Sequence, residues 1–317
     1  MAQRGAFKKI EVAGNKKLEW VMVRDNSKKT LDYLKDEFFY HDIDLADVGP
    51  PLQSPKIAIR SDYVFVVLQI PIFNDNTREA HTAEIDFFIE KDRIITIDLY
   101  GVKDLQNLFK IFSQKKTFPK TSTKHIVDDV PHLTYLIINS LIESLYPDLR
   151  SLSTDIETIE DHLFDSYDRA FIGDLLRVKT NIVRFRQAMQ GHDEILMRLA
   201  VFLKENVKMQ KVLDVYFQQL IDDTRDIKNR LLLKRETIDA LHETNQSLTD
   251  FRTNEIIKTL TIVSFVVFPL TLLAGIFGMN AINMPFVNHP LGFWIIIGIM
   301  LTGCVFMIGF FRHKKWI

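Results

Sequence analysis

The sequence contains very little cysteine. Cys304 is the only one in 317 residues, so no disulfide can form within the chain. It lies in an apolar stretch, where a lone cysteine is typical of a small apolar side chain. The lack of disulfides fits a large domain that faces a reducing compartment. The first residues, MAQRGAFKKIEVAGNKK, hold no apolar segment of signal-peptide length, so we expect no cleavage there.

Charged side chains are missing from one long stretch. The formal net charge is −1, which gives no overall basic field for nucleic acid, and no Asp, Glu, Lys or Arg occurs between Lys258 and Arg312. Within that stretch, Thr259–Phe277 and Leu291–Phe311 are each apolar over a length that crosses a bilayer. The sequence therefore predicts two transmembrane helices, at 259–277 and 291–311, joined by a short loop at 278–290.

Basic residues flank the two predicted spans on one side. Lys258 precedes the first span, and Arg312, Lys314 and Lys315 follow the second within a tail at 312–317. Positive charge beside a span is typical of the cytoplasmic side. We therefore expect an integral protein of the plasma (inner) membrane with both termini in the cytoplasm. Pro269 lies inside the first span and predicts a kink rather than a break, because neighbouring groups re-satisfy the freed carbonyl.

Residues 1–128 have the pattern of a mixed α/β domain, which we expect in the cytoplasm. Segments rich in β-branched and aromatic residues, separated by turn signals such as DNS and NDN, predict strands. The predicted strands are Leu18–Val23, Asp62–Phe73, Ala83–Glu90 and Arg93–Leu99. Apolar residues at helical spacing predict helices at Lys28–Phe39 and Lys103–Phe112.

Proline is absent between Pro147 and Pro269, which favours long helices. We expect a helical hairpin region at 129–207, with breaks near the glycines Gly173 and Gly191. A stalk helix is expected at 208–277, because nothing stops it before the end of the first span. Such a helix would be on the order of 100 Å long.

The stalk carries an apolar stripe with polar interruptions. Its apolar residues follow steps of three, four or seven: Leu213, Phe217, Leu220, Ile227, Leu231, Ile238, Leu241 and Leu248. Thr224, Lys234 and Asn245 interrupt this stripe. The pattern fits a coiled coil with imperfect positions, or a stalk whose face lines a wet axis.

A second stripe, of polar and small residues, runs through the first span. Its members recur in steps of seven, three, seven, four and three, and they are Asn254, Thr261, Ser264, Thr271, Gly275 and Gly278. They share one helix face, which fits a packing seam between membrane helices. It also fits a face that surrounds a pore. A two-helix hairpin cannot enclose a channel, so a pore requires several copies of the chain.

The end of the first span carries a specific motif. Gly278–Asn280 reads Gly-Met-Asn and is followed by Met-Pro at Met284–Pro285. Together with Asn254–Phe277 and the ending RHKKWI at Arg312–Ile317, this motif resembles the CorA family of magnesium channels. The resemblance implies an α/β cytoplasmic domain, a long-helix stalk and two C-terminal transmembrane helices, assembled as a funnel-shaped homopentamer. It also implies that the first transmembrane helix lines the pore and that Gly-Met-Asn forms the outer mouth.

Carried over one by one, the resemblance implies the site residues. The selectivity filter would be Gly278, Met279 and Asn280, and the pore and gate would be Asn254, Ile257, Leu260, Ser264, Phe268, Thr271 and Gly275. Three of them, Ile257, Leu260 and Phe268, would form an apolar gate that closes by dewetting. A ring of Asn280 carbonyls would accept hydrogen bonds from hydrated Mg²⁺ without stripping its water. Lys314 and Lys315 would form a basic ring.

The resemblance also implies regulation by cytosolic Mg²⁺ bound between neighbouring cytoplasmic domains. Asp47 matches one of the family's carboxylates, but the partner position on the stalk is Gln219, which carries no charge. Nearby carboxylates that would serve instead are Asp222, Asp223 and Asp226. A second departure is Phe286, where many members have a glutamate, so attraction of cations at the mouth should be weaker.

The sequence thus predicts a divalent-cation channel for passive, potential-driven Mg²⁺ influx, with Mg²⁺ both transported and regulatory. Its expected partners are copies of itself, the lipid bilayer and divalent cations, and not nucleic acid. Enzymatic activity is not expected, since no phosphate-binding loop, zinc-hydrolase motif or nucleophile elbow is present. Two alternatives stay open: transport of Zn²⁺, Co²⁺ or Ni²⁺ by the same fold, and a membrane-anchored coiled-coil scaffold.

Overall fold

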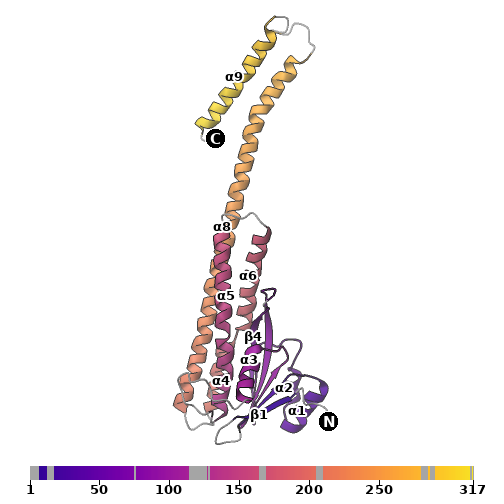
Figure 1. Ribbon diagram of the computed structural model, residues 1–317, viewed down its shortest axis with the longest axis vertical. Helices are drawn as coiled ribbons and strands as arrows, with labels where there is room; N and C mark the ends of the chain where they lie inside the picture. Colours follow the sequence, from indigo (N-terminus) through magenta and orange to yellow (C-terminus); the bar gives the residue numbers. More distant parts are fainter. Residues whose placement is uncertain are drawn as a thin grey trace. The chain divides into compact units, whose positions relative to one another are not determined.

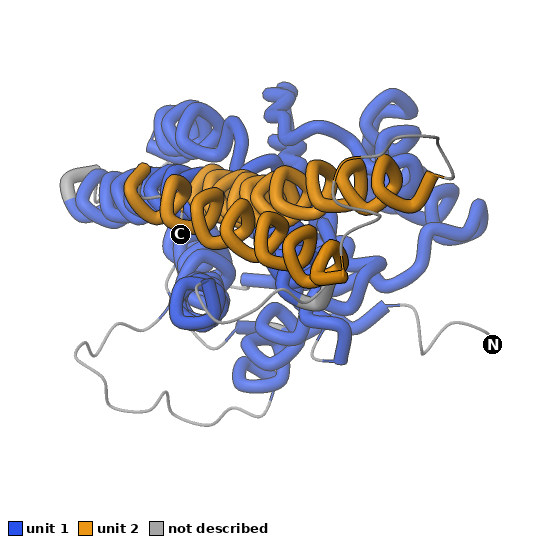
Figure 2. The backbone as a smooth tube through the Cα atoms, turned by 90° about the horizontal axis from the view of Figure 1, so that it is seen from above, with its two compact units in different colours: residues 1–241 blue, residues 242–317 orange. Residues whose placement is uncertain are grey.

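The computed structural model describes residues 7–12, 18–74, 76–113, 127, 129–163, 169–204, 210–279, 285, 290–314 and 316. The chain divides into two compact units, residues 1–241 and residues 242–317 (Figure 2). The finer division predicted from the sequence, with boundaries at 128, 207, 277, 290 and 311, stays a prediction.

A six-stranded sheet forms the centre of the first unit (Figure 1). Its strands are β1 (Phe7–Val12), β2 (Leu18–Val23), β3 (Lys56–Ile59), β4 (Val64–Phe73), β5 (Ala80–Ile89) and β6 (Arg93–Asp98). The order across the sheet is β1-β2-β6-β5-β4-β3, and every pair is antiparallel except β2 with β6. The predicted α/β character is confirmed, although the sequence reasoning missed β1 and β3.

One face of the sheet is covered by α1 (Lys28–Phe38) and α2 (Asp42–Ala46). Its core contains stacked aromatic rings, with Tyr40 4.1 Å from Phe88 between ring centroids. Beside the core, Asp44 is 1% exposed and accepts hydrogen bonds from Arg60 (2.5 and 2.9 Å) and from the Tyr63 hydroxyl (2.6 Å). Burial alone would raise the pKa of Asp44, but these bonds lower it. The network fixes α2 on the sheet.

Helices cover the opposite face: α3 (Lys103–Ser113), α4 (Val130–Glu143), α6 (Arg169–Ala188) and α7 (His192–Lys204). Trp20 of β2 packs edge-on against Phe109 of α3, with the ring centroids 5.0 Å apart. On α6, the Asn181 side chain accepts from the Ala80 amide at 2.8 Å and donates to the Arg78 carbonyl at 2.7 Å. These two bonds hold α6 against the start of β5.

The helical region continues with α5 (Leu145–His162), so residues after Val130 are helical as expected. The break predicted at Gly191 is confirmed, since this residue separates α6 from α7 with φ of 78°. The break predicted at Gly173 is wrong, because α6 runs through it. A glycine inside a helix costs only about 1 kcal/mol, which the neighbouring turns of a long helix can absorb.

The stalk helix α8 runs from Gln210 to Phe277, a length of 68 residues that includes Pro269. Over Leu213–Leu241 its apolar stripe is buried within the first unit. Tyr216 stacks on Tyr135 of α4 at 4.5 Å, and Lys228 pairs with Asp193 of α7 at 2.9 Å. The stripe is therefore an internal packing face in this part of the helix, and it does not line a wet axis there.

The second unit holds the rest of α8 and the helix α9 (Gly292–His313). Both helices are long and apolar enough to cross a membrane, and their apolar windows are 6% and 0% buried in the single chain. Side chains of this kind need lipid or other copies of the chain around them.

Candidate ion pathway and regulatory site

The predicted pore stripe of α8 is open in the single chain. Ile257, Leu260 and Phe268 are 55%, 65% and 70% exposed. The remaining described members are exposed, apart from the half-buried Thr261 and Ser264; the exposed ones are Asn254, Thr271, Gly275, Gly278 and Met279. The structure thus places these residues on accessible surface, where copies of the chain can bring them together around an axis.

Two threonines of the stripe bond to the helix itself. The Thr261 hydroxyl donates to the Ile257 carbonyl at 2.8 Å, and the Thr271 hydroxyl donates to the Val267 carbonyl at 2.9 Å. Because each hydroxyl uses its hydrogen internally, its oxygen remains an acceptor. Acceptor oxygens suit the water shell of a hydrated cation, whose hydrogens point outward.

The helix α9 contacts α8 beside the stripe. Phe311 contacts Phe265 edge-on, with the ring centroids 6.0 Å apart, and Phe265 is not a member of the stripe. The tail folds back, because the Trp316 amide donates to the Phe311 carbonyl at 3.0 Å. Lys314 lies at the end of α9, while Lys315 is outside the described residues. Phe265 lies one turn from Thr261 and from Phe268, so α9 borders one edge of the stripe.

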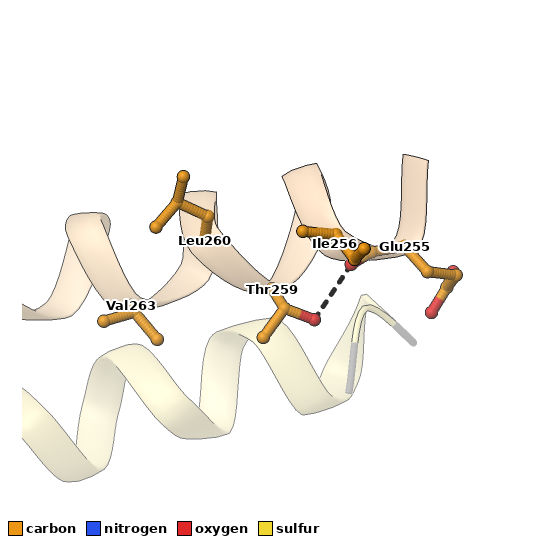
Figure 3. Close-up of a pocket in the computed structure, with 5 residues that line it drawn as sticks. All are labelled: Glu255, Ile256, Thr259, Leu260 and Val263. Atoms are coloured by element: carbon orange, nitrogen blue, oxygen red, sulfur yellow. Dashed lines mark hydrogen bonds between the residues drawn. The ribbon is translucent and has the colours of Figure 1, made fainter. Parts of the chain in front are cut away.

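A shallow pocket of about 420 Å³ lies beside the stripe near the start of the predicted span (Figure 3). It is lined by Glu255, Ile256, Thr259, Leu260 and Val263. The centre of this pocket, at Thr259, faces another side of α8, and only Leu260 belongs to both. The pocket marks the entrance to the apolar segment and holds one carboxylate, which lies 3.5 Å from the Lys258 ammonium.

The helix ends at the predicted filter. The Gly278 amide still bonds to the Ala274 carbonyl at 2.9 Å, and the Met279 amide reaches the Ile276 carbonyl at 3.3 Å, so the last turn tightens. A Cβ atom on Gly278 would lie 3.0 Å from the Ala274 oxygen, which is close for any other residue. Asn280 and Phe286 are outside the described residues, so their predicted roles stay predictions.

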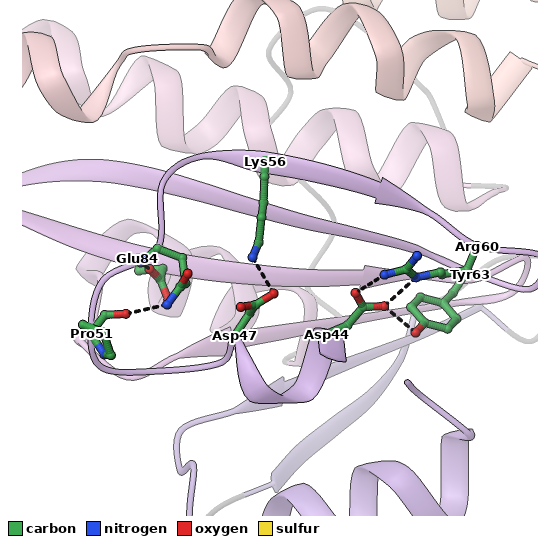
Figure 4. A network of polar contacts seen from close by, with 8 residues as sticks. Asp44, Asp47, Pro51, Lys56, Arg60, Tyr63 and Glu84 are labelled. Atoms are coloured by element: carbon green, nitrogen blue, oxygen red, sulfur yellow. Dashed lines mark hydrogen bonds and ion pairs between the residues drawn. The ribbon is translucent and has the colours of Figure 1, made fainter. Parts of the chain in front are cut away.

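The predicted regulatory carboxylate Asp47 has a partner in its own chain. It follows α2, and its Oδ2 atom lies 2.5 Å from the Lys56 ammonium of β3 (Figure 4). The Asp47 side chain is 28% exposed and that of Lys56 is 35% exposed. Asp47 is therefore accessible to a group from another chain. Its negative charge, however, is already balanced by Lys56 of its own chain.

The stalk carboxylates also have separate partners. Asp222 is 60% exposed at its side chain and accepts from Gln218 at 2.9 Å, with Arg225 3.6 Å away. Asp223 lies 3.5 Å from the Tyr146 hydroxyl. Burial, together with Glu143 and the neighbouring carboxylates, raises the pKa of Asp223. An acidic patch of this kind attracts a divalent cation, which would relieve the repulsion.

Sequence reasoning missed three charged residues near Asp47: Lys56, Glu84 and Asp86. The two acids alternate with apolar residues in AEIDFFIE and share a side of β5 with Phe88, which is in the core. The alternation in the sequence could have revealed these two acids, because polar residues on the core side of a strand require a partner.

Carboxylate oxygens are the donors that Mg²⁺ prefers, so Asp47 and the stalk acids fit a magnesium site chemically. Within the described part of the chain, no group of three or more His, Cys, Asp or Glu residues could hold a metal ion. A regulatory site would therefore need ligands from two chains or from the water shell of the ion.

A family comparison decides the class of the protein. The family model for CorA-like Mg²⁺ transporter proteins matches residues 15–313, nearly the whole chain. This chain belongs to the CorA family. The CorA family is one of transporters, which fits the absence of catalytic motifs in the sequence, and two apolar C-terminal helices fit an integral membrane protein.

Known CorA proteins are similar over most of their length. The cobalt/magnesium transport protein CorA of Thermotoga maritima is 23% identical over 299 residues, which cover 94% of this chain and 83% of that protein. The protein of the same name from Methanocaldococcus jannaschii is 25% identical over 264 residues, covering 83% and 80%. The solved structure of the complete CorA magnesium transporter from M. jannaschii superposes with a TM-score of 0.81 at 24% identity, covering 97% of this chain and 95% of that one. The predicted fold of the chain is thereby confirmed, while the funnel-shaped homopentamer stays a prediction.

Proposed function

We propose that this protein is a channel for passive Mg²⁺ entry into the cytoplasm. The observation that carries the proposal is the exposed stripe of polar, small and apolar residues along α8, in a CorA chain whose two apolar helices bury almost nothing. Several copies are needed to enclose a path along that stripe. The arrangement is a funnel-shaped homopentamer with both termini in the cytoplasm and α8 around the axis.

The stripe supplies three kinds of surface in sequence. Ile257, Leu260 and Phe268 form an apolar constriction, which closes when it loses water. Above it, the small Gly275 widens the path, and the Thr271 oxygen accepts hydrogen bonds from hydrated ions. At the mouth, a ring of Asn280 side chains accepts from the water shell of Mg²⁺, an ion that dehydrates reluctantly. A neutral ring binds weakly enough to let the ion leave.

No chemical fuel is required for this direction of transport. A divalent cation moving through a potential of 100 mV, negative inside, gains about 4.6 kcal/mol, from about 2.3 kcal/mol for each charge. Cytosolic Mg²⁺ bound at Asp47 and at Asp222 or Asp223 of a neighbouring chain closes the channel, which limits entry once the cell is supplied.

The deciding experiment is flux into liposomes that contain the purified protein and a Mg²⁺-sensitive dye. Asn280→Ala should reduce Mg²⁺ influx by about tenfold or more, since the ring loses its acceptors. Asn288→Ala is the matched control, because it removes the same side chain from the same predicted loop. Influx that is unchanged by Asn280→Ala would refute the pore assignment, and no influx from the parent protein would favour the scaffold.

Cobalt is the second cargo to test, because relatives of this chain are named cobalt/magnesium transport proteins. The same liposomes, loaded with dyes for Co²⁺, Ni²⁺ and Zn²⁺, compare these ions at equal concentration. Preference for one of them over Mg²⁺ would replace the cargo in the proposal and leave the pathway intact.

A further inference from the structure

Lys56 lies between two sets of carboxylates on one face of the sheet. Its ammonium pairs with Asp47 at 2.5 Å, as Figure 4 shows. In the strand register, Lys56 is opposite Val67, and Val67 is opposite Asp86, so these three side chains form a row on the same face. Glu84, two residues before Asp86 on β5, shares that face.

The two acids of β5 are buried without a cation. Glu84 and Asp86 are each 2% exposed, and within the described part of the chain Glu84 Oε1 and Asp86 Oδ1 have no hydrogen-bond partner. The other oxygen of Glu84 accepts from the Gln53 amide. Burial raises the pKa of both carboxyls, well above the usual range for Asp86, and the positive charge of Lys56 opposes this. An ammonium that moved toward them would gain a new partner.

We propose that Lys56 is an internal counter-ion that competes with Mg²⁺ for Asp47 and moves to Glu84 and Asp86 when Mg²⁺ binds. The inference rests on the proposed role of Asp47 as a Mg²⁺ sensor and adds the residue that sets its threshold. A lysine is suited to this exchange, because its compact charge sits on a flexible four-carbon stem.

The exchange follows from charge balance. Mg²⁺ at Asp47 repels an ammonium 2.5 Å from the same carboxylate, so binding requires that Lys56 leave. If the Lys56 ammonium moved into water, its ion pair with Asp47 would be lost. If it moves to Glu84 and Asp86, a new ion pair replaces the old one. Lys56 therefore weakens Mg²⁺ binding, and Glu84 with Asp86 limit that weakening. A half-exposed ion pair corresponds to a change in apparent affinity of about fivefold.

The test measures Mg²⁺ binding to the purified full-length protein by hydrogen–deuterium exchange of peptides that cover residues 44–59. Lys56→Gln should lower the Mg²⁺ concentration for half-maximal protection by about fivefold, because the competitor is gone. Lys56→Arg keeps the charge and should stay near the parent. Lys35→Gln is the matched control, since it removes the same charge from a pair with Asp42 at 2.7 Å in the same unit.

A variant of the buried acids tests the second half of the exchange. Glu84→Gln combined with Asp86→Asn removes the alternative partner of Lys56, so half-maximal protection should require about threefold more Mg²⁺. Exchange without Mg²⁺ reports whether the variant keeps the fold. If it does not, Glu84→Gln alone is used.

Asp47→Ala separates failure of this inference from failure of the sensor. Loss of Mg²⁺ protection in Asp47→Ala with an unchanged midpoint in Lys56→Gln would overturn the role of Lys56 alone. Full protection in Asp47→Ala would overturn the sensor and this inference with it. If Lys56→Gln and Lys35→Gln shifted the Mg²⁺ concentration for half-maximal protection equally, the shift would be a general charge effect. That result would also overturn the inference.

Discussion

His192 shows how one buried residue links the fold to pH. It is the first residue of α7, 2% exposed, and its Nε2 atom has no partner within the described residues. Burial lowers the pKa of His192 from its usual 6.5 to about 4, and Lys228 nearby acts in the same direction. Between these two pH values His192 is protonated in the unfolded chain but neutral in the folded chain. The free energy of unfolding therefore falls as pH falls.

We expect this group alone to cost about 2 kcal/mol of stability between pH 7 and pH 4.5. His192→Gln removes the titrating group and should flatten the pH dependence by that amount. Urea unfolding of the purified protein at several pH values, followed by circular dichroism, measures both slopes. Asp193, which pairs with Lys228, stays in place in both proteins. Identical slopes for parent and variant would contradict the assignment.

The central strands and the apolar spans could be predicted from the sequence, because each is set by a local pattern. β2 and β6 were found within one residue of their ends, and both membrane helices were found from their apolar length. The edge strands β1 and β3 were missed, because edges carry charges such as Lys8 and Lys56 that break the apolar pattern. The partner of Asp47 was missed for a related reason. Lys56 reaches Asp47 only because β3 lies beside the end of α2.

At the scale of the element, α8 changes role along its length. Up to Leu241 the residues of its apolar stripe are buried in the first unit, and beyond that point Leu260 and Phe268 are exposed. Burial cannot explain large apolar side chains at these exposed positions. In the proposed channel these side chains form a gate that closes by excluding water, which requires apolar rings facing an axis.

Phe268→Ser should therefore open the gate under closing conditions. Replacing the ring by a small hydroxyl side chain lets water stay, so flux at high internal Mg²⁺ should rise by about tenfold, which corresponds to about 1.4 kcal/mol off the barrier. Val266→Ser is the matched control, because Val266 lies two residues before Phe268, on the opposite side of α8. Liposome flux with Mg²⁺ on both sides measures the leak. An equal leak in both variants would place Phe268 outside the gate.

At the scale of the molecule, the second unit is incomplete as a single chain. Its two helices contact each other through Phe265 and Phe311, yet only 6% and 0% of their apolar windows are buried. Lipid can cover the apolar residues, but it offers no hydrogen-bond donors to the acceptor oxygens of stripe residues such as Thr261 and Thr271. In the proposed channel, a shared axis between copies gives these groups water. The proposed function therefore implies one pore per assembly rather than one pore per chain.

Mixed assemblies test that consequence. Parent chains and Asn280→Ala chains, co-expressed with different tags at known ratios, are purified and placed in liposomes. If each pore takes its Asn280 ring from several chains, a single variant chain weakens the whole ring, so Mg²⁺ flux should fall more steeply than the fraction of parent chains. The same series with Asn288→Ala should leave flux unchanged. Flux that falls in direct proportion to the parent fraction would mean that each chain conducts alone, and the shared pore would be wrong.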